Sequence, residues 1–182
     1  MGFASPYILK ARRIVQDLCR LKIEWDDPIP EEHQEKWLQR MNALQEMKMV
    51  RVPRCLQPQR DDEEAETDQV REKRLHHFAD ASEMAYGVVT YLRTEYASGL
   101  VSTVLVTAKS RLAPLKTTTI PMLELCAATL ATRQDEMLRR ELDLVLEPSQ
   151  YWSDSTIVLW YINHEEKRFQ TFVANRVSEI RG

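Results

Sequence analysis

The stretch LHHFADASEMAYGVVTYL, residues 75–92, decides the fold of this 182-residue chain. An apolar and aromatic run over 75–79 ends in Asp80, and after a short polar break residues 85–92 are rich in β-branched and aromatic side chains. Both runs are typical of β-strands, and residues 101–108 add a third run in which apolar and polar residues partly alternate. Because the connections are short and polar, the three strands are predicted to form an antiparallel meander.

Helices and one more strand are predicted after this meander. A proline at residue 121 favours the first turn of a helix that runs to about residue 142, with apolar side chains at helical spacing. Residues 150–153 are predicted to form a short strand, and the apolar pattern predicts further helices over 157–162 and 169–180. The expected fold class is therefore α/β, a mixed sheet flanked by helices, in the order three strands, helix, strand, helix, helix.

Acidic residues fall where this order of elements can bring them together. Asp80 ends the first strand, Glu124 lies in the first turns of the long helix, and Asp154 ends the fourth strand. Carboxylate oxygens are the ligands that Mg²⁺ prefers, and two such ions about 4 Å apart can hold the attacking and the leaving oxygen of a phosphodiester. The pattern favours a metal-dependent nuclease.

Each of these acids also has a simpler explanation. The chain holds 28 acidic residues against 25 basic ones, and most acidic side chains lie on solvated surfaces. A carboxylate early in a helix, such as Glu124, is stabilised by the helix dipole. Asp154 can cap the helix that follows it. The order of the elements, rather than any one acid, therefore carries the metal-site hypothesis.

Several stretches of the chain carry a resemblance to a known family. They are residues 78–87 (FADASEMAYG), 108–116 (AKSRLAPLK), 120–128 (IPMLELCAA), 152–155 (WSDS) and 172–177 (FVANRV). In this combination, which spans most of the C-terminal two thirds, the chain resembles the pol polyprotein of Pao/BEL-type retrotransposons, the Pao retrotransposon peptidase family. The predicted order of elements is also that of the ribonuclease H fold.

The resemblance implies a type-1 ribonuclease H-like domain that hydrolyses the RNA strand of an RNA–DNA hybrid during reverse transcription. Asp80, Glu124 and Asp154 match three of its catalytic, metal-binding acids, with Mg²⁺ as cofactor and Mn²⁺ as a substitute. The family has a fourth acid on a later helix, and this chain ends at Gly182 before reaching it. The domain is thus expected to be incomplete at its C-terminus, and an inactive interaction or scaffold module is the alternative to an active endonuclease.

The family's name raises a third function, an aspartic peptidase. Such a site needs paired aspartates in Asp-Ser-Gly or Asp-Thr-Gly turns, where glycine permits the tight backbone. Residues 80–82 (DAS) and 154–156 (DST) lack that glycine. The peptidase is therefore ranked below the nuclease.

The N-terminal third is predicted to be helical. Apolar residues recur at helical spacing from Ser5 onward and again over 31–49, and Trp25 and Trp37 are expected to pack the two helices against each other. By resemblance, residues 1–57 look like the end of the reverse transcriptase region, which makes the rest of that polyprotein a possible partner. Residues 58–74 are acidic and predicted to be a solvated linker before a ribonuclease H-like domain over 75–182.

Charge and hydropathy restrict the partners. The net charge of −3 is not typical of a nucleic-acid-binding protein, but Lys109, Arg111 and Arg176 are candidate nucleic-acid-binding residues, with ordinary surface charge as the alternative. No apolar run is long enough to cross a membrane, and no secretion signal precedes the first helix. We therefore expect an intracellular protein, cytoplasmic or nuclear, without membrane partners.

Histidine and cysteine add no metal site in this reading. Cys19, Cys55 and Cys126 are widely spaced and form no paired motif, so neither a disulfide framework nor a zinc site is indicated. His76 and His77 lie close to Asp80 in sequence, and surface or strand-end roles are expected for both.

Overall fold

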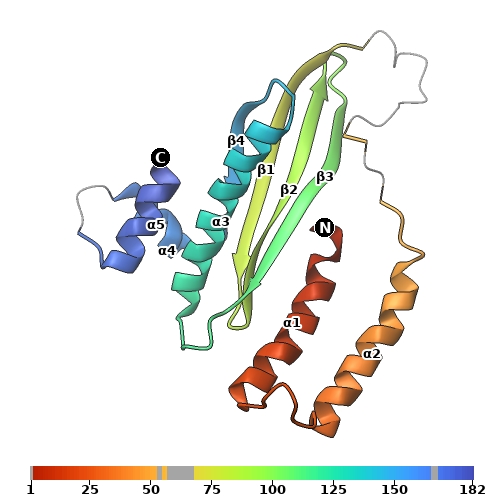
Figure 1. Cartoon of the computed structure of the whole chain (residues 1–182). Helices are drawn as coiled ribbons and strands as arrows, with labels where there is room; N and C mark the ends of the chain where they lie inside the picture. Colours follow the sequence, from red (N-terminus) through yellow and green to blue (C-terminus); the bar gives the residue numbers. More distant parts are fainter. Residues whose placement is uncertain (1, 53–54, 57–67, 165–167) are drawn as a thin grey trace.

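The computed structural model describes residues 2–52, 55–56, 68–164 and 168–182. Its centre is a four-stranded sheet in the order β3-β2-β1-β4, shown in Figure 1. Strands β1 (Val70–Ala81), β2 (Ala85–Tyr96) and β3 (Val101–Leu112) form the predicted antiparallel meander, and β4 (Glu147–Trp152) pairs with β1 in parallel. The mixed α/β sheet predicted from the sequence is confirmed.

The alternation of side chains along β2 explains why the sheet forms. Every second residue from Val88 to Tyr96 is buried, and the residues between them are more exposed. One face of the sheet is thus apolar enough to be covered. The connection to β3 turns at Gly99, whose φ of +86° lies in the left-handed region that glycine adopts without steric cost.

The first strand begins at Val70, five residues before the predicted start at residue 75. Its first residues are charged and were assigned to the predicted linker over 58–74, of which residues 58–67 lie outside the described part of the chain. Ion pairs across the strands hold this end: Arg71 contacts Glu95 at 3.1 Å, and Arg93 contacts Glu72 at 3.3 Å. The linker prediction was wrong for residues 70–74. This part of β1 is held by charged pairs across the strands, and charged residues leave no hydrophobic pattern in the sequence.

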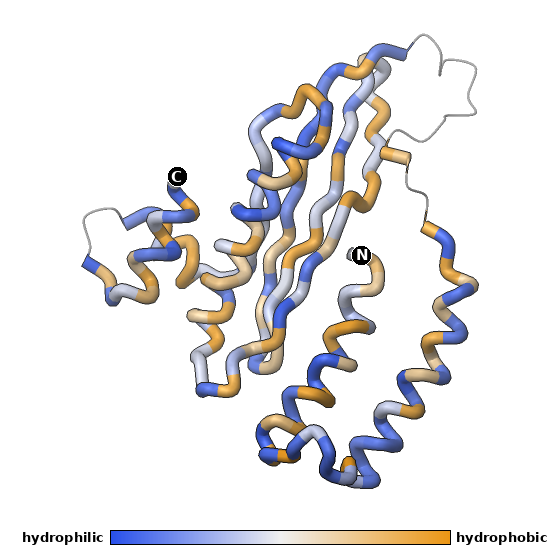
Figure 2. Tube along the Cα trace, in the orientation of Figure 1, coloured by the Kyte–Doolittle hydropathy of each residue, from blue (hydrophilic) through white to orange (hydrophobic). Residues whose placement is uncertain are grey.

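Helix α3 (Ile120–Glu141) covers one face of the sheet (Figure 1). Hydrophobic and hydrophilic positions alternate along the strands and along this helix, as Figure 2 shows. Small side chains let the helix approach the sheet closely; the main contact cluster consists of Ala79, Val88, Ala127, Leu130 and Ala131.

Two shorter helices pack on the side of α3 that faces away from the sheet. They are α4 (Thr156–Asn163) and α5 (Thr171–Arg181), and with α3 they bury Leu125, Val158, Val173 and Val177. The predicted order of three strands, helix, strand, helix, helix is therefore confirmed.

The N-terminal segment holds a short 3₁₀ turn η1 (Gly2–Ala4) and the helices α1 (Ser5–Arg20) and α2 (Glu31–Met47). Helix α1 starts against β3, where the Ser5 and Ser110 hydroxyls are 2.8 Å apart. The tryptophan packing predicted here is wrong, because Trp25 is fully exposed and Trp37 is 45% exposed. Within the described residues, no helix combines the length and the apolar character that a membrane span requires.

Candidate functional site

The parallel pairing of β1 with β4 sets the position of two of the three predicted acids. Phe78 of β1 lies opposite Trp152 of β4. Asp80 follows Phe78 by two residues and Asp154 follows Trp152 by two residues, so both come at the same step beyond a matched pair. Since parallel strands end at the same edge of a sheet, the two aspartates belong to one edge.

Glu124 joins this edge through a hydrogen bond. Its Oε2 accepts from the Ser155 hydroxyl at 2.5 Å, and Ser155 is the neighbour of Asp154 in the chain. Glu124 comes from α3, so this contact ties the helix to the segment that leaves β4. We call Asp80, Glu124 and Asp154 together the acidic edge.

The structure removes the helix-end explanations for two of the acids. Ser155, not Asp154, caps α4, because its Oγ accepts the backbone N–H of Val158 at 3.3 Å. Glu124 is the fifth residue of α3, and the first turn of this helix holds no acidic residue. Neither capping nor stabilisation in the first helical turn accounts for these two carboxylates.

Asp80 lies on the other side of the sheet from α3. Its neighbour Ala79 is buried against α3, and successive side chains of a strand point to opposite faces. The Oδ1 of Asp80 accepts the backbone N–H of Ala81 at 2.7 Å. The exposed aspartate also lines a cavity of about 330 Å³ between the sheet and the start of α1, which includes Ser5 and Leu9.

The acidic edge suits a hard divalent cation by its chemistry. All three residues are carboxylates, the oxygen ligands that Mg²⁺ and Mn²⁺ prefer. In the part of the chain that the structure describes, no three His, Cys, Asp or Glu side chains gather at metal-binding spacing. The three residues therefore fit the ion by donor type, whereas the described structure does not bring their side chains to metal-binding spacing, and their role as metal ligands stays a prediction.

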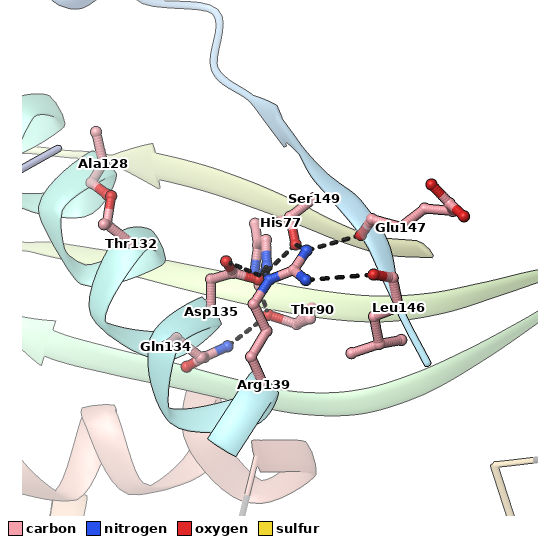
Figure 3. A network of polar contacts seen from close by, with 10 residues as sticks. All are labelled: His77, Thr90, Ala128, Thr132, Gln134, Asp135, Arg139, Leu146, Glu147 and Ser149. Carbon is pink, nitrogen blue, oxygen red and sulfur yellow. Dashed lines mark hydrogen bonds and ion pairs between the residues drawn. The ribbon is translucent and has the colours of Figure 1, made fainter. Parts of the chain in front are cut away.

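A buried polar network lies behind the acidic edge, between α3 and the sheet (Figure 3). His77 is fully buried; its Nε2 lies 3.0 Å from Oδ1 of Asp135, and its Nδ1 lies 2.8 Å from the Thr90 hydroxyl. Gln134 donates to the same Thr90 oxygen at 2.6 Å. With Nε2 carrying the proton, the Thr90 hydroxyl donates to Nδ1 and every one of these contacts is satisfied.

Arg139 extends this network to β4, as Figure 3 shows. It donates to Asp135 at 3.0 Å, to the Ser149 hydroxyl at 2.7 Å and to the backbone carbonyl of Glu147 at 2.7 Å. The Ser149 hydroxyl in turn donates to Asp135 at 2.5 Å. These bonds join the end of α3 to β4, the strand that leads to Asp154.

The network shifts two ionisation equilibria. Burial alone would raise the pKa of Asp135, but hydrogen bonds from His77, Ser149 and Arg139 outweigh it and hold that pKa well below its usual range. Burial, and then the charge of Asp135, raise the pKa of the Tyr151 phenol. Asp135 is therefore an ionised carboxylate held by several donors.

The surface role predicted for His77 is wrong, and the sequence pattern did contain a signal for its burial. His77 lies between Leu75 and Ala79, both of which are buried on the α3 side of β1. Polar residues at such inward positions are hydrogen-bonded in folded proteins. A search for polar partners at the other inward positions, on β2 and on α3, would have pointed to Thr90 and Asp135.

The three basic candidates do not all line one pocket. Arg111 of β3 and Arg176 of α5 line the same small pocket, which Arg133 of α3 also lines. Lys109 lies two residues before Arg111 on β3, pairs with Val88 and is not part of that lining. The structure brings together two of the three basic residues that the sequence singled out.

Comparison with known proteins identifies the family. The model of one family, described as the Pao retrotransposon-like RNaseH-like domain, matches residues 1–155. This match covers the N-terminal helices, the sheet and all three residues of the acidic edge. No curated protein and no solved structure matches the chain. The chain therefore belongs to the Pao retrotransposon-like ribonuclease H-like family.

Proposed function

We propose that this chain is a metal-dependent ribonuclease H-type domain that hydrolyses the RNA strand of RNA–DNA hybrids during reverse transcription. The arrangement of the three acids carries the proposal. Asp80 and Asp154 each come two residues after the paired residues Phe78 and Trp152. Glu124 accepts a hydrogen bond from Ser155, which follows Asp154 in the chain. Family membership supports a retrotransposon-type nuclease and a nucleic-acid partner.

The acidic edge would hold Mg²⁺ or Mn²⁺ through Asp80, Glu124 and Asp154. Such an ion supplies an activated water and neutralises the negative charge that develops on the phosphate. The protein's part is to keep the carboxylates in place. Ser155 fixes Oε2 of Glu124, and the backbone N–H of Ala81 fixes Oδ1 of Asp80.

The buried network supports the same edge from behind. Arg139 links Asp135 of α3 to the Glu147 carbonyl and the Ser149 hydroxyl of β4. The strand that ends before Asp154 is thereby held against α3, which carries Glu124. A catalytic edge requires this kind of rigid support.

The test is cleavage of a labelled RNA–DNA hybrid with Mg²⁺ or Mn²⁺ by the parent chain and by its Asp80→Asn and Asp154→Asn variants. We expect cleavage by the parent and its loss in both variants, since each variant removes one negatively charged ligand. Asp143→Asn is the matched control, because Asp143 is exposed and lies in the connection between α3 and β4. Cleavage that persists in the Asp80 and Asp154 variants would overturn the assignment.

A second candidate function, an interaction module, is favoured by an aromatic surface on the sheet. The rings of Phe78 and Trp152 are stacked with centroids 5.8 Å apart, and the two residues remain 43% and 47% exposed. The Trp152 indole also donates to Nδ1 of His76 at 3.1 Å. A folded parent chain that does not cleave the hybrid would favour this second function.

A further inference from the structure

Three arginines from three different elements line one small pocket beside α3. They are Arg111 of β3, Arg133 of α3 and Arg176 of α5, and the pocket measures about 60 Å³. Tyr86 and Cys126 are part of the same lining. We call this site the arginine pocket. A cavity of this size has room for a small anion.

The arginine pocket is held by contacts that fix the direction of Arg176. Its Nε donates to the Cys126 sulfur at 3.3 Å, and its Nη1 donates to the Phe172 carbonyl at 3.0 Å. The guanidinium also lies 3.5 Å from the centre of the Phe172 ring. From the other side, Arg111 stands opposite Tyr86 on the paired strands β3 and β2. The site is therefore assembled before any ligand arrives.

The charges around the pocket do not balance. The Nε and Nη2 groups of Arg133 both donate to the Glu179 carboxylate, and this hydrogen bonding raises the pKa of the guanidinium. Across the described residues, Arg111 has neither an ion pair nor a hydrogen bond from its side chain. Like charges that converge without enough counter-charge repel one another, and an anion in the pocket would remove that repulsion.

We propose that the arginine pocket binds a phosphate group of the nucleic-acid backbone. Guanidinium groups present planar pairs of N–H donors that match phosphate oxygens, and backbone phosphates supply most of the affinity of proteins for nucleic acids. The choice of an RNA–DNA hybrid as the nucleic acid rests on the proposed function. The phosphate site itself rests on the three arginines.

The arginine pocket and the acidic edge share the start of α3 and the end of the β1–β2 pair. Cys126 follows Glu124 by two residues in α3, a rise of about 3 Å along the helix axis, and the two side chains leave the helix about 200° apart. Tyr86 pairs with Ala81, the neighbour of Asp80. The arginine pocket is therefore near the acidic edge along these elements but faces another direction.

The test is binding of a fluorescently labelled RNA–DNA hybrid in EDTA, measured at several salt concentrations. Without divalent metal there is no cleavage, so failure of this proposal is distinct from failure of the nuclease proposal. For Arg111→Gln and Arg176→Gln we expect affinity to fall about tenfold, and the slope of log K against log salt to decrease in magnitude by about one. Arg140→Gln is the matched control, because Arg140 is on the same helix as Arg133, 73% exposed and paired with Glu141.

Folding is checked by thermal unfolding of each variant. Arg176→Gln loses its contacts to Phe172 and Cys126 and is expected to be less stable, so Arg111→Gln carries the test. Hybrid binding by Arg111→Gln with the parent's affinity and salt slope would overturn the proposal, as would a folded parent chain that does not bind the hybrid. Inorganic phosphate is titrated in parallel: phosphate binding lost in Arg111→Gln, with hybrid binding unchanged, would also exclude the backbone as the ligand.

Discussion

A single hydroxyl group, that of Ser155, serves two elements of this fold. It accepts the Val158 N–H at 3.3 Å as the cap of α4 and donates to Glu124 of α3 at 2.5 Å. Both bonds depend on the oxygen position that the β4-to-α4 turn imposes. Asp154 is thereby left without the capping role that its place in the sequence had offered.

Replacing Ser155 by Ala is expected to lower the free energy of unfolding by about 1 kcal/mol, because a helix cap is lost. It is also expected to reduce hybrid cleavage, since Glu124 loses the donor that holds its Oε2. Urea unfolding and the cleavage assay check the two effects. Ser178→Ala, at an exposed position of α5, is the control. Unchanged cleavage by Ser155→Ala would show that this bond does not position Glu124.

Strand β4 shows how side chains can hold an element that its own sequence specifies weakly. It has six residues, includes Pro148, and pairs only with β1 among the described strands. Proline removes a backbone donor, which an edge strand tolerates. Arg139 offsets this weakness by donating to the backbone carbonyl of Glu147 and to Ser149.

Arg139→Gln is expected to destabilise the protein by about 2 kcal/mol, because Asp135 then keeps its burial but loses a charged donor. Amide hydrogen exchange should become faster in β4 than in β2, since β2 is paired on both sides and β4 on one. The neighbouring Arg140→Gln, which leaves this network intact, is expected to match the parent. Equal exchange of β4 in Arg139→Gln and the parent would contradict the proposed support of this strand.

The elements themselves were largely predictable, and their ends were not. Periodicity over 85–92 and over the long helix predicted β2 and α3 in type and order. β1 was predicted to start at residue 75 because its first residues are charged, yet pairs such as Arg93 with Glu72 extend it to Val70. Charge pairing between strands cannot be read from one segment, since both strands must be in register for it to form.

At the scale of the whole molecule, the Asp135 network joins four elements: β1 through His77, β2 through Thr90, α3 itself and β4 through Ser149. Donors to Asp135 keep its pKa below the value of about 3.9 expected in the unfolded chain. The unfolded state therefore takes up a proton first as pH falls. The stability that Asp135 contributes is complete above about pH 4 and is lost progressively below it.

The free energy of unfolding of the parent is thus expected to fall as the pH drops from about 5 to about 2, and the part of the fall due to Asp135 comes mainly below about pH 4. Asp135→Asn is expected to be less stable at neutral pH and to lose less stability over that range. Denaturant unfolding at a series of pH values measures both slopes. Asp143→Asn, at an exposed position, should keep the parent's slope. Parallel slopes for the parent and Asp135→Asn would exclude this carboxylate as the source.

The sequence by itself determined the α/β class, the order of strands and helices, and the three acids at the ends of their elements, because hydrophobic periodicity and motifs are local properties. Only the tertiary structure decided that Ser155 rather than Asp154 caps α4, that His77 is buried, and that Arg111 and Arg176 meet at one pocket. These outcomes depend on strand register and helix packing, which join residues far apart in the chain. Local patterns carry no information about which of those distant partners will meet.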